Sequence, residues 1–395
     1  MRKILYIEEI KDKKELLNKS LLNKEEIKIG LDRIIKNIDE NLDRYTNKFP
    51  SACTTNLKYR VKDNDDWTNG FWTGMLWLAY EYTGDAKYRE IAELHTQNFK
   101  ERYEKDYVLN HHDLGFLYSL SAIADYKITG DKEARELGLK AANKLKGRYQ
   151  AKGEFIQAWG DLSDEKEYRL IIDCFLNLPL LYWAYEETLD KSFLDVANNH
   201  FKTAINNVIR EDSSTYHTYY FDRNTGEAVK GVTHQGFKND SCWARGQAWA
   251  ILGLPINYKY NKNEDSEEIF KGVTNYYLNR LPEDLIPYWD LIFKEEDKEP
   301  RDSSSAVIAA CGIFEMNKLF KDYENKEVYT RSAHEMIRNL INNYMTVNED
   351  SDGILMHGVY SWQHNKGVDE CNLWGDYFFM ESLMRLYKED FGGYW

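Results

Sequence analysis

Two aspartates stand where long apolar runs begin. Asp113 precedes the run in segment 111–131, "HHDLGFLYSLSAIADYKITGD", and Asp173 lies inside a similar run, "IIDCFLNLPLLYWAYEETLD". An Asp at a helix start usually caps the helix by accepting hydrogen bonds from its free N–H groups. Asp173 follows two isoleucines, so we expect it to be buried, and burial raises the pKa of a carboxyl. A carboxyl with a raised pKa can act as a general acid near neutral pH. These residues predict acid–base chemistry at Asp173, with Asp113 as a second acid on the same face.

Aromatic and polar side chains elsewhere in the chain are candidates for sugar contacts. The sequence contains 11 Trp, 29 Tyr and 17 Phe, and this aromatic excess favours a cleft with flat walls. Trp67, Trp72 and Trp159 are candidate stacking platforms, although large helical cores also use tryptophan. Arg245 and Trp249 are four residues apart and therefore share a helix face, and a buried Arg245 requires an anionic partner from the protein or a ligand. The remaining candidates are His217, His234, Gln235, Ser361, His364 and Lys366.

Motifs for other chemistries do not occur. The sequence has no GxGxxG or GxxxxGK[ST], which cradle nucleotides, and no GxSxG or HExxH. The pair His111–His112 lacks the spaced partners of a metal site. We therefore expect no metal and no organic cofactor.

The elements that must position these residues are mainly helices. Apolar helices are expected to begin near Trp67, Asp113, Asp173, Trp243, Ser303 and Asn372. Amphipathic helices are expected from Asn23, Asp85, Asp131, Asp190, Asp265 and Asn325. A helix that is apolar all round is buried on every side, and an amphipathic helix is buried on one side. Six of each in alternation predict an all-α (α/α)6 barrel of inner and outer helices, with an open solenoid of helix pairs as the rival.

The connections between these helices are unequal. Those from inner to outer helices are short, whereas those from outer to inner helices include the long segments 147–170, 211–241, 281–302 and 346–370. One of them, "STYHTYYFDRNTGEAVKGV", reads as a hairpin that turns at 224–226. Long loops usually carry function. We therefore place the site at the amino-terminal ends of the inner helices, where free N–H groups favour an anion.

Length and charge narrow the class of protein. We assign all 395 residues to one barrel domain, and the net charge of -14 argues against nucleic acid or anionic membranes as partners. The five cysteines have no zinc-like spacing and fit a reducing compartment. No signal peptide or membrane span is expected. We predict a cytoplasmic enzyme that is a monomer or homodimer.

The chain resembles the unsaturated glucuronyl hydrolases of glycoside hydrolase family 88. The resemblance extends from about Trp67 to Trp374, and it is most specific in "HDLGF", in "IIDCFLNLPLLYWA", and in the spacing around "YHT", "HQG" and "ARGQAW". It implies an (α/α)6 barrel without a cofactor. It also implies a substrate, the 4,5-unsaturated uronic acid that lyases leave at the non-reducing end of glycosaminoglycan oligosaccharides of the chondroitin, hyaluronan or heparin type.

The same resemblance implies roles for individual residues. Asp173 would protonate C4 of the vinyl ether and activate water for addition at C5, after which the hemiketal opens and the glycosidic bond is lost. Asp113 would bind sugar hydroxyls and hold the geometry. Positions that match substrate-binding residues are Trp67, Trp159, His217, Gln235, Arg245 and Trp249. Arg245 would lie near the uronate carboxylate.

Relatives that favour sulfated disaccharides carry an Arg partner followed by Ser-x-x-Ser-x-Lys. In this chain Ser361 and Lys366 match that pattern, His364 replaces the second Ser, and His234 stands in the place of the Arg. Neutral histidines carry less fixed charge than an Arg. The alternatives are an unsaturated rhamnogalacturonyl hydrolase acting on pectin fragments, a sugar epimerase on the same barrel, and a carbohydrate-binding scaffold without turnover.

Overall fold

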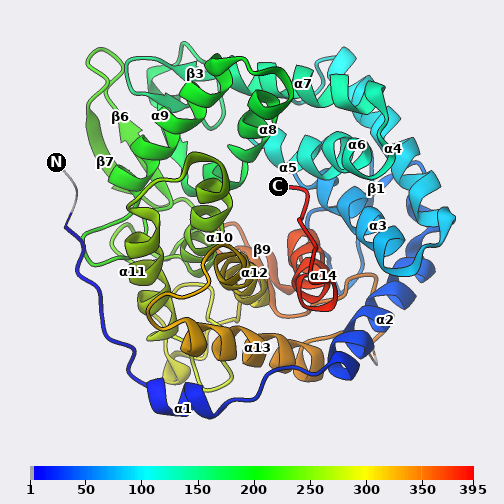
Figure 1. Cartoon of the computed structure of the whole chain (residues 1–395), viewed down its shortest axis with the longest axis vertical. Helices are drawn as coiled ribbons and strands as arrows, with labels where there is room; N and C mark the ends of the chain where they lie inside the picture. Colours follow the sequence, from blue (N-terminus) through cyan, green and yellow to red (C-terminus); the bar gives the residue numbers. More distant parts are fainter. Residues whose placement is uncertain (1–3, 348) are drawn as a thin grey trace.

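Two concentric rings of helices form the molecule. The structure is a computed structural model that describes residues 4–347 and 349–395. Figure 1 shows the rings end-on. The inner ring consists of α3 (Asn69–Thr83), α5 (Leu114–Tyr118) with η2 (Ser119–Ile123) and α6 (Ala124–Thr129), η4 (Ile172–Leu176) with α8 (Pro179–Thr188), α10 (Ala244–Asn261), α12 (Ser303–Leu319) and α14 (Leu373–Tyr387). The outer ring consists of α2 (Lys24–Asn41), α4 (Ala86–Glu104), α7 (Lys132–Lys146), α9 (Lys191–Val208), α11 (Ser266–Leu278) and α13 (Lys326–Asn343).

This arrangement confirms the predicted (α/α)6 barrel and excludes the open solenoid, because α14 packs against both α2 and α3 and closes the ring. Burial follows the expected division. Residues 244–257 of α10 are buried without a break, whereas α9 buries one face only. The short helix α1 (Lys13–Asn18) precedes the barrel and packs against α13. Among the described residues, no helix is both long and apolar enough to cross a bilayer.

The turns from inner to outer helices have the predicted chemistry. Gly84 and Gly130 end their helices with φ values of 73° and 79°, a backbone conformation that favours glycine. Asp85 and Asp131 then cap the next helices, accepting hydrogen bonds from the N–H groups of Lys87 and Glu133. In the third repeat Leu189, not a glycine, takes the left-handed position, with φ 60°.

Two inner helices are less regular than predicted. The run after Asp113 contains η2, a π-helical turn, between α5 and α6. The run around Asp173 starts as the 3-10 turn η4, and its α-helix begins only at Pro179. Proline has no N–H to donate within a helix, so it is best placed in the first helical turn. Asp173 therefore lies in a separate turn ahead of the helix, not inside it.

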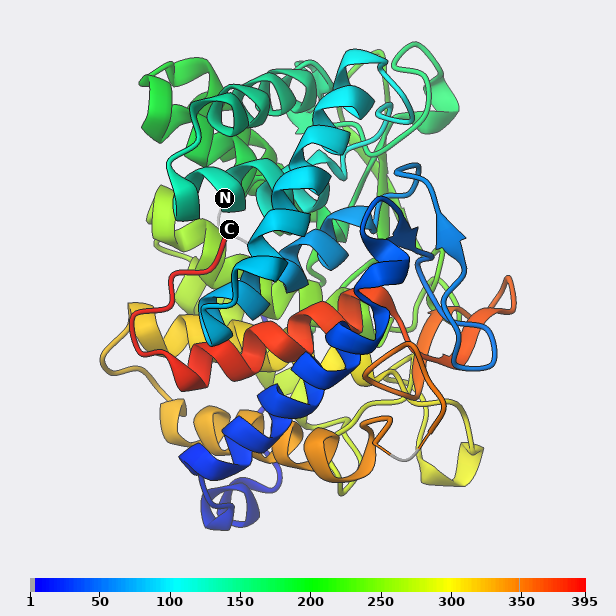
Figure 2. The same cartoon turned by 90° about the vertical axis from the view of Figure 1, so that its right-hand side faces the viewer.

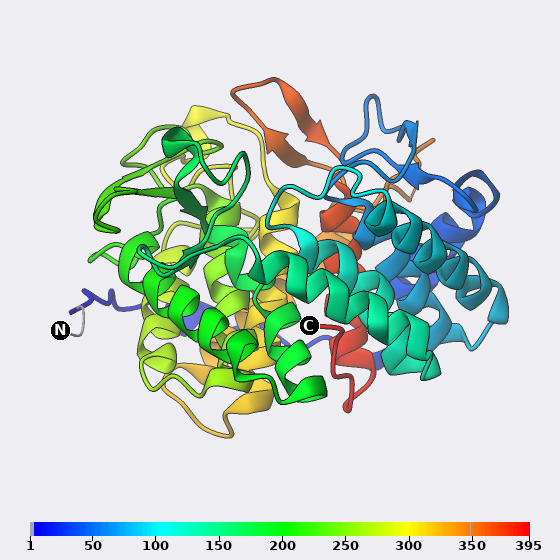
Figure 3. The same cartoon turned by 90° about the horizontal axis from the view of Figure 1, so that it is seen from above.

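The long loops project from one end of the barrel, as Figures 2 and 3 show. They contain antiparallel strand pairs, and the hairpin predicted around 224–226 is confirmed as β6 with β7. The strands are β1 (Phe49–Pro50) with β2 (Val61–Lys62), β3 (Tyr149–Gln150) with β4 (Phe155–Ile156), β5 (Arg169–Ile171) with β6 (Thr218–Phe221) and β7 (Ala228–Val232), and β8 (Gly358–Ser361) with β9 (Lys366–Glu370). Besides η4, the described residues form the short 3-10 turns η1 (Asp43–Tyr45), η3 (Glu165–Glu167) and η5 (Glu295–Asp297).

The last residues of the sequence turn back into the centre of the barrel (Figure 1). The indole of Trp395 stacks on Phe378, with ring centroids 5.9 Å apart, and lies edge-on to Phe116. Its Nε1 donates a hydrogen bond of 2.9 Å to Glu381. Phe116 also packs against Trp249. These four rings, Phe116, Trp249, Phe378 and Trp395, form an aromatic layer that we call the floor.

Candidate active site

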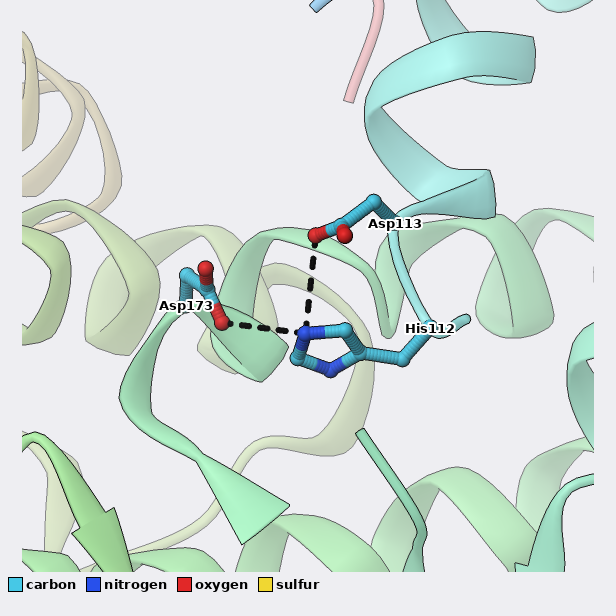
Figure 4. Close-up of side chains that lie close together, drawn as sticks. All are labelled: His112, Asp113 and Asp173. Atoms are coloured by element: carbon cyan, nitrogen blue, oxygen red, sulfur yellow. Dashed lines mark ion pairs between the residues drawn. The ribbon is translucent and has the colours of Figure 1, made fainter. Parts of the chain in front are cut away.

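The fold brings Asp113 and Asp173 together at the end of the barrel that carries the long loops. Asp113 is the residue before α5 and Asp173 lies in η4. His112 stands between them, with its Nε2 3.5 Å from Oδ1 of Asp113 and 3.3 Å from Oδ1 of Asp173. Figure 4 shows the ring aimed at both carboxylates. The expectation that the two acids meet at one end of the barrel is confirmed.

A close approach between two backbones sets this geometry. A Cβ added to Gly115 would lie 2.4 Å from Cα of Asn177, so only glycine lets α5 lie against the turn after Asp173. Oδ1 of Asn177 accepts a hydrogen bond of 3.2 Å from the N–H of Phe116. Its Nδ2 donates to the carbonyl oxygen of Asp173 at 3.4 Å. Asn177 therefore fastens the two acid-bearing segments to each other.

The loop before Asp113 is held under strain. Val108 has φ 51°, a conformation that is unfavourable for a β-branched residue. The buried guanidinium of Arg102 binds the carbonyl oxygens of Tyr107 and Val108 at 3.1 and 2.7 Å. Nε2 of His111 lies 3.0 Å from the oxygen of Val108, and Nδ1 of His111 accepts from the N–H of Asp113 at 3.1 Å. These contacts fix the start of α5.

The surroundings shift the pKa values of the two carboxyls in opposite directions. Burial, and then the charge of Asp113, raise the pKa of Asp173 well above its ordinary value. Burial would also raise the pKa of Asp113, but His112, His111 and an Asn177 hydrogen bond outweigh it and lower that pKa. Burial lowers the pKa of His112 to about 4, so its ring is neutral near pH 7, and neither ring nitrogen makes a hydrogen bond to the described residues. The surroundings thus favour the protonated form of Asp173 and the ionised form of Asp113.

The Asp113 carboxylate is available to contact a substrate because it makes no capping hydrogen bond to α5. Both side chains also remain reachable, with relative exposures of 12% for Asp113 and 19% for Asp173. A substrate entering from the loop end can therefore contact both carboxylates.

His112, Asp113 and Asp173 are also a set that could hold a metal ion, because their ligand atoms lie within 4.8 Å of one another. The sequence shows no spaced partner for the two histidines, and the fold supplies two carboxylates beside one of them. A metal ion bound here would displace the proton from Asp173. The proton-carrying and metal-bound forms of the set are therefore mutually exclusive.

Arg245 has its anionic partner within the protein. Its Nη1 lies 2.5 Å from Oδ2 of Asp302, and both side chains are almost completely buried. Its Nη atoms also donate to the carbonyl oxygens of Val359 and Tyr360 and to Oε1 of Gln235. With these four bonds Arg245 joins α10 to α12, to β8 and to the 233–241 loop. The donors on both Nη atoms are engaged within the protein, and the expected place of Arg245 near the uronate carboxylate stays a prediction.

The tryptophans and histidines line a wall beside the acids. Trp67 stacks on Trp374 and donates from Nε1 to the hydroxyl of Tyr360 at 3.0 Å. Trp159 pairs with His111 through the backbone, and its ring lies 5.8 Å from that of His234. Both tryptophans are only partly buried, as a stacking platform requires. Trp72 is 3% exposed and belongs to the core.

The other predicted residues lie in the wall, on the surface or in the floor. His217 is buried, with its ring 5.8 Å from that of His234. Ser361 and His364 hydrogen-bond each other at 2.8 Å, and His364 packs against His234 at 5.6 Å, so these residues continue the wall. Lys366 is exposed, with its Nζ 4.0 Å from the Tyr360 ring. Trp249 is 1% exposed and belongs to the floor, so in this structure its ring offers no open face to a sugar.

Four residues that shape the site were not predicted from the sequence. These are His112, Asn177, Asp302 and Arg102. The motif "HHD" contained a signal for His112, because it lies directly before a candidate acid. Asp302 was recognised only as a helix boundary, since its pairing with Arg245 spans 57 residues.

A closed (α/α)6 barrel with a buried acid pair and aromatic walls at its loop end defines a carbohydrate-processing enzyme. Comparison with known proteins narrows this class. Residues 41–380 match the model of Glycosyl Hydrolase Family 88. The chain belongs to this family and is a glycoside hydrolase, in agreement with the resemblance stated from the sequence.

Relatives in this family are similar over their whole length. The chain is 51% identical to the unsaturated chondroitin disaccharide hydrolase of Streptococcus pneumoniae, covering 100% of both sequences. A crystal structure of the unsaturated glucuronyl hydrolase of Streptococcus agalactiae superposes with a TM-score of 0.97 at 49% identity, covering 100% of both chains. An Asp-to-Asn variant of that enzyme, in complex with dGlcA-GalNAc6S, has a TM-score of 0.90 at 46% identity and the same coverage.

Proposed function

We propose that this glycoside hydrolase removes the terminal 4,5-unsaturated uronic acid from disaccharides of the chondroitin type. The activities for which the two streptococcal relatives are named, and the disaccharide bound to one of them, support this substrate class. The observation that carries the proposal is the acid pair, in which Asp173 has a raised pKa and Asp113 a lowered one.

We propose that Asp173 acts first as an acid and then as a base. Its proton adds to C4 of the C4=C5 double bond, and the positive charge that develops at C5 is shared with the ring oxygen. The resulting carboxylate takes a proton from water, and the hydroxide adds at C5. The product is a hemiketal, which opens to a ketone. Ring opening leaves C1 as an open-chain hemiacetal, which collapses to an aldehyde and releases the acceptor sugar as an alcohol. One water is consumed and Asp173 regains its proton.

Asp113 and His112 support these steps without changing protonation. Ionised Asp113 accepts hydrogen bonds from sugar hydroxyls and keeps the pKa of Asp173 high. The Nε2 of His112 lies within 3.5 Å of an oxygen of each acid, so the dipole of the neutral ring acts on both. We assign Trp67 and Trp159 to stacking, and His217, His234, Ser361, His364 and Lys366 to the walls. We assign Gln235 to the same site. Its Oε1 accepts a hydrogen bond from Arg245, which also binds β8, and this contact holds the 233–241 loop in place.

The test is loss of enol-ether absorbance with a lyase-generated chondroitin disaccharide. General acid–base catalysis contributes about 100- to 10,000-fold, so Asp173→Asn should lower kcat by a factor in that range. Asp125→Asn is the matched control, because burial also raises the pKa of Asp125, to about 6, on α6 near the opposite end of the barrel. Full activity of Asp173→Asn would contradict the assignment. If the enzyme hydrolyses unsaturated rhamnogalacturonan fragments in preference to chondroitin disaccharides, the assigned substrate class is wrong.

Location and assembly complete the proposal. We propose that the enzyme works in the cytoplasm as a monomer or homodimer on one anionic disaccharide, with no metal or organic cofactor. All five cysteines are free and buried, which supports a reducing compartment. Activity that survives extensive chelation would support the absence of a metal requirement.

A further inference from the structure

An exposed aromatic surface lies at the rim of the loop end, outside the site described above. Trp362, in the turn of the β8–β9 hairpin, is 40% exposed, and Phe237, in the 233–241 loop, is 45% exposed. Trp362 stacks on the buried Trp289, with centroids 5.1 Å apart and planes inclined by 9°. Phe293 packs against both Trp289 and Phe237. We call these four residues, Phe237, Trp289, Phe293 and Trp362, the rim platform.

The rim platform is pre-organised by contacts between three loops. Nε1 of Trp289 donates to Glu299 at 2.9 Å, and the carbonyl oxygen of Trp289 accepts from the N–H of Ala244 at the start of α10. The side chain of Gln363 donates to the carbonyl oxygen of Gly236, which ties the hairpin turn to the 233–241 loop. A flat ring held in this way loses little entropy when a ligand binds.

A series of pairwise contacts leads from the acid pair toward the hairpin that carries Trp362. Trp362 directly follows Ser361, which hydrogen-bonds His364, and His364 packs against His234. His234 packs against Trp159, whose backbone pairs with His111, two residues before Asp113. Figures 2 and 3 show the β8–β9 hairpin and the 281–302 loop projecting on the same side of the barrel. This series of neighbours leads from the acid pair to the β8–β9 hairpin, whose turn carries Trp362.

We propose that the rim platform is a binding subsite for a further sugar residue of longer substrates, beyond the disaccharide. This inference rests on the proposed function. The unsaturated sugar occupies the acid pair, so the rest of an oligosaccharide extends outward from the barrel. The apolar face of a sugar ring stacks on the free face of Trp362, since aromatic rings attract C–H groups. Lys366, on the same hairpin, contributes a positive charge for an anionic chain.

The surroundings favour a sugar over a protein partner. The exposed large hydrophobic residues of this region are Phe237, Ile292 and Trp362. Exposed charged residues border them, namely Lys238, Asp240, Lys294, Glu295, Glu296 and Asp297. A stable protein interface uses about 20 to 30 residues on each side, with few charges at its centre. A small aromatic patch with a charged border matches one or two sugar rings better.

The experiment compares kcat/KM for an unsaturated chondroitin disaccharide and the corresponding tetrasaccharide. The native enzyme should favour the tetrasaccharide by about threefold to tenfold, the range for one aromatic stacking contact. In Trp362→Ala the ratio should fall to about one, and Trp362→Phe should restore part of it. Tyr387→Ala is the matched control, because Tyr387 is 47% exposed at the end of α14 away from the loops. This control should keep the native ratio.

Three results would overturn the inference. The first is a native enzyme that hydrolyses the disaccharide without favouring the tetrasaccharide. The second is a preference that survives in Trp362→Ala. The third is a dimer in size-exclusion chromatography that Trp362→Ala converts to a monomer, which would assign the rim platform to self-association. A native enzyme inactive on both substrates would instead refute the proposed function, and the inference with it.

Discussion

Gly115 offers the most direct test of how the acid pair is held. A Cβ at this position would lie 2.4 Å from Cα and 2.6 Å from Oδ1 of Asn177, where ordinary contacts begin at 3.4 Å. The first of these neighbours is backbone and cannot rotate away. Gly115→Ala therefore requires α5 and the turn after Asp173 to separate by about 1 Å.

A displacement of this size should act mainly on catalysis. Misplacement of a reacting group by about 1 Å can cost about 100-fold in rate, so we expect kcat of Gly115→Ala to fall by about that factor. Overpacking should also lower the free energy of unfolding by about 1–3 kcal/mol. The assays are loss of enol-ether absorbance at saturating disaccharide and urea unfolding followed by circular dichroism.

Gly30→Ala is the control that separates the effect of crowding on stability from the effect of displaced acids on kcat. A Cβ at Gly30, in α2, would meet the flexible end of Leu383 at 2.9 Å, far from the acids. This variant should lose some stability and keep kcat. If Gly115→Ala is folded and retains native kcat, the contact with Asn177 does not set the catalytic geometry and the reasoning fails.

Three further perturbations test the charges. Burial and the charge of Asp113 both raise the pKa of Asp173, and Asp113→Asn removes the second cause. The alkaline limb of the pH profile of kcat should therefore move to lower pH. An unmoved limb would show that burial alone raises this pKa. Asp302→Asn leaves the buried charge of Arg245 without its counterion and should cost about 3–5 kcal/mol in urea unfolding, and the double variant Arg245→Met/Asp302→Leu should lose less. Burial raises the pKa of Asp376 from 3.8 to about 7, so native protein binds the proton more tightly than unfolded protein, and stability falls as pH rises between these values. Asp376→Asn should flatten the dependence of the unfolding free energy on pH in this window, and an unchanged slope would contradict the assignment.

The helical architecture could be predicted from the sequence because its determinants are local. The amphipathic helix after Asp85 and the one after Asp131 begin one residue beyond their predicted caps. Gly84 and Gly130 end the preceding helices for the same local reason, their left-handed backbone conformation. Periodicity and capping act within a few residues, so they are visible in any single stretch of the chain.

The detailed site could not be predicted in the same way. Two acids at helix starts could be assigned to one end of a barrel, but the position of His112 between them depends on how α5 meets η4. Arg245 could be seen to need an anion, and which anion it binds depends on a contact with α12. Trp249 shares a helix face with Arg245, but the aromatic packing against Phe116 decides that it is covered. These outcomes follow from tertiary packing.

The closure of the ring has a consequence for synthesis of the protein. α14 lies between α2 and α3, so segments separated by more than 300 residues must meet before the inner ring is complete. Trp395 reaches Phe116, directly beneath Asp113, from the opposite end of the sequence. A nascent chain emerging from the ribosome can form its helix pairs in order, but the ring stays open and the floor incomplete until α14 and Trp395 have been translated. Loss of the short segment that carries Trp395 would therefore remove one ring of the floor and loosen the active site.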